Sequence, residues 1–84
     1  MSFVDVLGWI GMVLILGAYF AVSFEKIKST SVWYQVANLV GAVAIGINTY
    51  FYMAYPSTVV NVVWAIIAAA ASWKIWRDIA RKFD

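Results

Sequence analysis

Apolar residues fill two long stretches of the chain that carry no charge. The first, Val6 to Phe24, holds about 19 residues, close to the roughly 20 that a helix needs to cross a ~30 Å hydrocarbon core. The second, Ser29 to Trp73, holds about 45 residues, enough for two crossings, and includes the only proline, Pro56. Backbone in lipid must satisfy its own hydrogen bonds, which favours helices. The pattern therefore predicts an all-α membrane protein with three transmembrane helices. Their expected bounds are residues 6–24, 32–54 and 57–76.

The last residues of the chain follow a different pattern. Ile75 and Ile79 lie one helical turn apart, and the basic residues around them occupy another face. We expect residues 77–84 to continue the third helix as a short amphipathic tail against the membrane lipids. Residues 1–84 then form a single domain.

The basic residues indicate an orientation. All six Lys and Arg lie in the connection after Phe24 or near the C-terminus, and none lies near the N-terminus or Pro56. Cytoplasmic loops of membrane proteins carry an excess of Lys and Arg. We therefore expect the N-terminus outside and the C-terminus in the cytoplasm.

Composition narrows the possible chemistry. The chain is 65% hydrophobic and 12% charged, and it has neither cysteine nor histidine. Disulfide scaffolds, thiol chemistry and the usual zinc or iron-sulfur ligands are thereby excluded. The uncharged stretches contain no acid or base. We expect no enzyme, no catalytic residue, no metal site, no cofactor and no nucleic-acid partner.

Each expected helix has one side rich in polar or small residues. On the second helix this side spans an ~80° arc at 100° per residue; it consists of Asn38, Gly41, Ile45, Asn48 and Tyr52. The stripe on the third helix consists of Asn61, Trp64, Ala65, Ala68 and Ser72. The first helix offers Gly8, Gly11, Ile15, Ala18 and Tyr19.

Two interpretations of these faces stay open. Small residues let helices approach closely, and an asparagine amide can join them; the candidate packing residues are Gly11, Gly41, Gly46, Ala65 and Ala68. Alternatively, amides line a cavity for a neutral polar solute, with Trp64 as a flat stacking surface. The candidate substrate-binding residues are Asn61, Trp64, Asn48, Asn38 and Tyr19.

The segments GWIGMVLILGAYF, EKIKSTS, QVANLVGAV and VVNVVWA follow one another in an order that resembles the SemiSWEET and PQ-loop superfamily of bacterial half-transporters. The resemblance covers nearly the whole chain, but the Pro-Gln motif of the first helix is absent. It implies a triple-helix bundle packed in the order first, third, second. It also implies a homodimer around a central sugar cavity, in which Asn61 matches a substrate-contacting asparagine.

Two functions follow as hypotheses. In the first, two copies form a half-transporter dimer in the bacterial cytoplasmic (inner) membrane that lets a small neutral polar metabolite, such as a sugar, pass. In the second, the chain is a non-transporting accessory or structural subunit of a larger membrane complex. Asn61→Ala separates them, because it should abolish flux only in the first.

Overall fold

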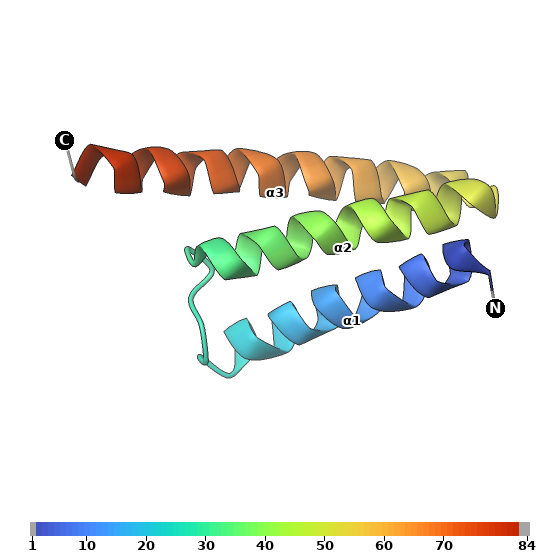
Figure 1. Ribbon diagram of the computed structural model, residues 1–84, viewed down its shortest axis with the longest axis horizontal. Coiled ribbons are helices and arrows are strands. Elements are labelled where there is room, and N and C mark those ends of the chain that lie inside the picture. Colours follow the sequence, from blue (N-terminus) through green and yellow to red (C-terminus); the bar gives the residue numbers. More distant parts are fainter. Residues whose placement is uncertain (1, 83–84) are drawn as a thin grey trace.

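The computed structural model describes residues 2–82, and these residues form three helices joined by two short connections (Figure 1). The helices are α1, Phe3–Ser23, α2, Val32–Phe51, and α3, Tyr55–Lys82. At 1.5 Å per residue they measure about 31, 30 and 42 Å. The all-helical class and the three helices expected from the sequence are confirmed. The expected tail continues α3 without a break as far as Lys82, and residues 83–84 lie outside the described residues.

Helix α2 lies between α1 and α3 and packs against both, whereas α1 and α3 do not pack against each other within residues 2–82 (Figure 1). The expected packing order of first, third, second is therefore wrong. Residues of α2 that meet α1, such as Gly41 and Asn48, point roughly 110° away from those that meet α3, such as Asn38 and Gly46. Two helices that pack ~9 Å from α2 at that angle lie about 15 Å apart, beyond the usual 8–10 Å contact distance.

Glycines bring α1 and α2 into close contact. A Cβ atom on Gly11 would lie 2.7 Å from the carbonyl oxygen of Gly41, and one on Gly41 would lie 2.7 Å from Cγ1 of Ile15. Both distances are shorter than van der Waals contact, so only a residue without a side chain fits either position. The two glycines therefore allow the backbones of α1 and α2 to approach closely at this point.

The connection between α2 and α3, residues 52–54, lies earlier in the chain than the sequence pattern predicts and is one residue longer. The second helix ends at Phe51 instead of Ala54, because Met53 adopts a left-handed conformation (φ 58°) and closes the helix end. The backbone N–H groups of Met53 and Ala54 donate to the carbonyls of Tyr50 and Thr49, as in a Schellman motif. Helix α3 then begins at Tyr55, so Pro56 lies in its first turn, where a missing N–H costs nothing.

Small side chains form the buried interior. Large apolar side chains remain at the surface: Phe3 is 76% exposed and Trp33 is 79% exposed. Helices α1 and α3 are each long and apolar enough to cross a membrane, and most of their residues face outward. Helix α2 is as long and carries no charged residue, but its amide and tyrosine side chains lower its hydropathy. The buried residues are Gly11, Ala18, Asn38, Gly41, Ala42, Ala44 and Ala68.

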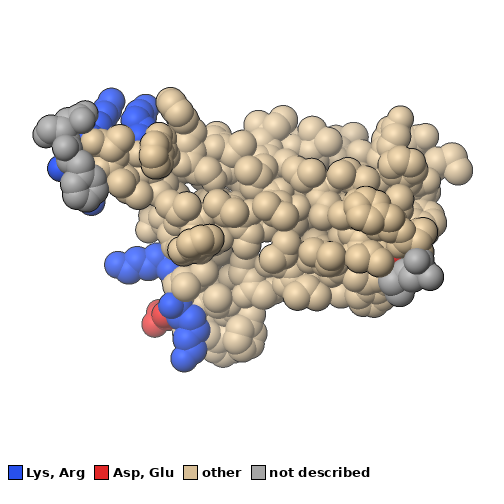
Figure 2. Space-filling model, in the orientation of Figure 1, with Lys and Arg blue, Asp and Glu red and all other residues tan. Residues whose placement is uncertain are grey.

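Basic side chains gather at one end of the molecule (Figure 2). The connection after α1 supplies Lys26 and Lys28, and the end of α3, which extends past the other two helices, supplies the rest (Figures 1 and 2). Between Ser29 and Trp73 the chain carries no charge at all. The opposite end, where α1 begins and α2 turns into α3, carries Asp5 as its one charged side chain among the described residues.

Candidate functional site

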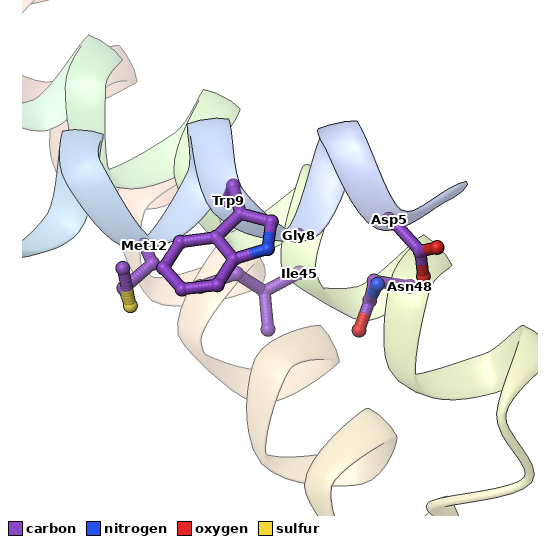
Figure 3. Close-up of a pocket in the computed structure, with 6 residues that line it drawn as sticks. All are labelled: Asp5, Gly8, Trp9, Met12, Ile45 and Asn48. Carbon is purple, nitrogen blue, oxygen red and sulfur yellow. The ribbon is translucent and has the colours of Figure 1, made fainter. Parts of the chain in front are cut away.

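A pocket opens between the start of α1 and the end of α2 (Figure 3). We call it the α1–α2 pocket. It has a volume of about 370 Å³ and is open to the outside. Its lining residues are Asp5, Gly8, Trp9, Met12, Ile45 and Asn48.

A smaller pocket lies further along α2, against α3. We call it the α2–α3 pocket. It has a volume of about 140 Å³. Its lining residues are Tyr34, Gln35, Asn38, Trp64, Ile67 and Ala68.

Both pockets open on the same side of α2. Ile45 in the first pocket and Asn38 in the second are seven residues apart, which places them within about 20° of each other around the helix. That direction lies between the contact faces for α1 and α3. We call this the open side of the molecule, because no helix of the chain covers it within residues 2–82.

Asn48 joins α2 to α1 in the α1–α2 pocket. Its Nδ2 donates a hydrogen bond of 2.9 Å to the backbone carbonyl of Val4. Carbonyl groups in the first turn of a helix normally accept a hydrogen bond from the next turn of the same helix. A carbonyl oxygen can accept two hydrogen bonds, so Asn48 adds a second donor to the Val4 oxygen. A Cβ atom on Gly8 would lie 2.6 Å from the same amide nitrogen, so Gly8 provides the space that Asn48 occupies.

Asp5 is held by three hydrogen bonds. Its backbone N–H donates to Ser2 Oγ at 3.3 Å, and its Oδ2 accepts from the backbone N–H of Ser2 at 3.2 Å, which together make a capping box. Its Oδ1 accepts a hydrogen bond from the hydroxyl of Tyr52, just beyond the end of α2. This bond to the carboxylate raises the pKa of Tyr52 above its ordinary value. The first turn of α1 is thus fixed to the end of α2.

Asn38 and Trp64 form the polar contact between α2 and α3. The indole Nε1 of Trp64 donates to Asn38 Oδ1 at 3.1 Å, and Asn38 Nδ2 donates to the carbonyl of Tyr34 at 2.9 Å. Asn38 is only 5% exposed, whereas Trp64 is 48% exposed. The nitrogen and the oxygen of the buried Asn38 amide therefore each have a partner, while about half of the Trp64 side chain remains exposed.

The structure does not gather all five candidate substrate-binding residues at one place. Asn38 and Trp64 are in contact, and Asn48 lies in the other pocket on the same side. Asn61 lies three residues before Trp64 on α3 but borders a different pocket, beside Gly46, and its Nδ2 donates to the backbone carbonyl of Ser57 in its own helix. Tyr19 is 67% exposed on α1 and lines neither pocket.

The candidate packing residues lie at two helix contacts. Gly11 and Gly41 face each other between α1 and α2. A Cβ atom on Gly46 would lie 3.6 Å from the Cβ of Asn61, which is ordinary van der Waals contact. Ala68 packs against α2 and is only 2% exposed. Ala65 and Gly46 also border an apolar groove of about 370 Å³ on the other side of the α2–α3 contact.

Sequence reasoning missed Asp5, Trp9 and Met12. The available signal was their spacing of four and three residues, which places all three on one face of α1 beside Gly8. What no spacing shows is that Asn48 meets this face from α2.

Comparison with known proteins gives a family and no function. A protein-family model, described only as a family, matches residues 4–80, so the chain belongs to that family over nearly its whole length. No curated protein and no solved structure matches it.

Proposed function

We propose that the protein spans a bacterial cytoplasmic membrane three times, with the N-terminus outside and the basic end in the cytoplasm. The clustering of the basic side chains at one end supports this orientation. A chain whose large apolar side chains are mostly exposed is suited to lipid, since soluble monomers rarely expose so much continuous apolar surface. Helix α2, which carries no charge, would cross between the two more apolar helices.

We further propose that two copies form a passive route for a small neutral polar metabolite, as the resemblance to the SemiSWEET and PQ-loop superfamily implies. The open side carries this proposal, because both pockets open on it and one chain cannot enclose it. Asn48 and Asp5 bring hydrogen-bonding groups to that side, and Trp64 brings a half-exposed aromatic ring. Two copies that face each other about an axis along the membrane normal would enclose a route lined by these groups. The helices are not packed in the order that the resemblance to the superfamily implies. The proposal is therefore supported by the open side and not by the packing order.

The test is solute flux in proteoliposomes, with sugars and other neutral hydroxylated solutes. Met12→Trp would narrow the α1–α2 pocket at a position that is already 36% exposed, so folding should persist. Val13→Trp is the matched control, because Val13 is 63% exposed and lies about 100° further round α1. We expect flux to fall at least tenfold in Met12→Trp and to be unchanged in Val13→Trp. Equal flux in both variants, or none in the unmodified protein, contradicts the transport proposal.

A second candidate function is a non-transporting subunit of a larger membrane complex. The hydrogen bonds from Asn48 to Val4 and from Trp64 to Asn38 support it, because both side chains are used to hold helices together. Native mass spectrometry of the complex in mild detergent separates the two functions. A species of about twice 9.4 kDa supports the transport dimer, and one copy bound within a larger assembly supports the subunit.

A further inference from the structure

The α1–α2 pocket carries a negative charge that nothing nearby neutralises within the described residues. Among the described residues, Asp5 is the one charged side chain at its end of the molecule, and the described Lys and Arg residues lie at the other end (Figure 2). The hydrogen bond from Tyr52 leaves the carboxylate ionised, because the hydroxyl donates to it without giving up its proton.

Helix dipoles do not cancel this charge. The pocket lies between the N-terminal end of α1, which carries a partial charge of about +0.5, and the C-terminal end of α2, which carries about −0.5. The two contributions offset each other. Among the charges of residues 2–82, the carboxylate of Asp5 therefore dominates the field in the pocket.

Two further groups in the pocket can contact a ligand. The Oδ1 atom of Asn48 accepts no hydrogen bond from residues 2–82, whereas its Nδ2 already donates to Val4. The indole of Trp9 is 57% exposed and lies beside the pocket with its nitrogen on the side of Asn48 (Figure 3). A carboxylate, an amide oxygen and an aromatic ring together suit a cation that donates hydrogen bonds.

We propose that the α1–α2 pocket binds an ammonium group, which donates to the oxygens of Asp5 and Asn48 and lies against the ring of Trp9. Phosphates and carboxylates are disfavoured there because they would face the Asp5 charge. The pocket is open, so the ammonium group can belong to a free amine or to the headgroup of a zwitterionic phospholipid such as phosphatidylethanolamine. The proposal does not depend on transport, and a protein without flux could still bind at this site.

The experiment for the free amine is an NMR titration of the purified protein in detergent. The probe is ethylammonium chloride, with ethanol as the neutral ligand of equal size and sodium chloride as the salt control. The signal is the indole N–H of Trp9, assigned by its loss in Trp9→Leu. We expect a saturable shift with ethylammonium only, and binding at least tenfold weaker in Asp5→Asn.

Two further variants separate charge from folding. Asp5→Asn also weakens the contact with Tyr52, whereas Tyr52→Phe removes that contact and keeps the carboxylate. Tyr52→Phe should therefore still bind ethylammonium. Asp78→Asn, an acid at the basic end, is the matched control and should bind like the unmodified protein. Equal shifts with ethanol, or binding unchanged in Asp5→Asn, overturn the proposal.

The experiment for the lipid source is native mass spectrometry after exchange into equal amounts of phosphatidylethanolamine and phosphatidylglycerol. Retention of phosphatidylethanolamine that Asp5→Asn loses assigns the headgroup as the ligand. A response to ethylammonium without such retention assigns a free amine. If neither ethylammonium nor phosphatidylethanolamine binds in this way, the proposed site is wrong, whatever the flux assay shows.

Discussion

Gly11 and Gly41 face each other across the contact between α1 and α2, and neither position has room for a methyl group. The nearest atoms to a Cβ on Gly11 are the Gly41 carbonyl oxygen and Cγ1 of Ile45, each at 2.7 Å. Backbone cannot yield as a flexible side chain can. The closeness of α1 to α2 at this contact therefore depends on this pair.

The first prediction is that Gly11→Ala lowers the free energy of unfolding by about 1–3 kcal/mol, the usual cost of forcing an extra carbon into a packed contact. Gly17→Ala is the matched control, because a Cβ there meets nothing within 4 Å. It should be neutral or stabilise by up to ~1 kcal/mol through helix propensity. Unfolding in detergent mixtures, followed by circular dichroism, measures both. Equal effects of the two variants would show that α1 does not pack on α2 through Gly11.

The second prediction concerns the asparagines. Asn48→Ala removes the hydrogen bond that joins α2 to Val4 and should cost about 0.6 kcal/mol, and at most ~1.7 kcal/mol. Asn61→Ala should change the stability less, because its amide donates only to its own helix. The same unfolding assay compares them. A larger loss of stability in Asn61→Ala than in Asn48→Ala would mean that Asn61 joins helices. Asn61→Ala could then not test flux separately from folding.

The third prediction is that Met53→Gly stabilises the protein. Met53 has φ 58°, a conformation that costs a residue with a Cβ about 1 kcal/mol and costs glycine little. Part of the gain is lost because glycine makes the unfolded chain more flexible, so we expect a net gain of about 0.5 kcal/mol. Met53→Ala keeps the Cβ and should show no gain. A loss of stability in Met53→Gly would indicate that the Met53 side chain makes contacts worth more than the backbone strain.

The sequence predicts the helices well because charges mark their ends, and helix formation in an apolar stretch needs no tertiary information. The helix ends near Pro56 are less predictable. A proline is compatible either with a turn between helices or with the first turn of a helix. Glycine or asparagine usually occupies a left-handed helix end, so a methionine at position 53 does not predict one.

The packing order could not be predicted because the polar arc of α2 contains two contacts and not one. The arc from Asn38 to Asn48 spans only ~80°, yet Asn48 meets α1 while Asn38 meets α3. Asparagines that look like one cavity lining in the sequence thus divide between two helix contacts. The α1–α2 pocket could not be predicted for a related reason. Asp5 and Trp9 line it from α1, but Asn48 lines it from α2, and the sequence does not show that these two helices meet there.

The last prediction tests how many times the chain crosses the membrane. The protein has no cysteine, so single-cysteine variants can be labelled cleanly with a membrane-impermeant maleimide. Three crossings place Ser2 and Ser57 outside and Ser29 in the cytoplasm, since α1, α2 and α3 separate these positions. In intact spheroplasts, Ser2→Cys and Ser57→Cys should be labelled, and Ser29→Cys should be labelled only after lysis.

The labelling of Ser57 relative to Ser29 decides the role of α2. The most apolar 18-residue window of α2 has a lower mean hydropathy than those of α1 and α3. A chain that crosses the membrane only twice, through α1 and α3, is therefore the specific alternative. In that case Ser29 and Ser57 would lie on the same side and would be labelled together. Lys82→Cys, at the end of α3, is the internal control: with three crossings it reacts like Ser29→Cys, and with two it lies on the side of Ser2. Joint labelling of Ser29→Cys and Ser57→Cys would therefore contradict both the three-span topology and a transport route lined by α2.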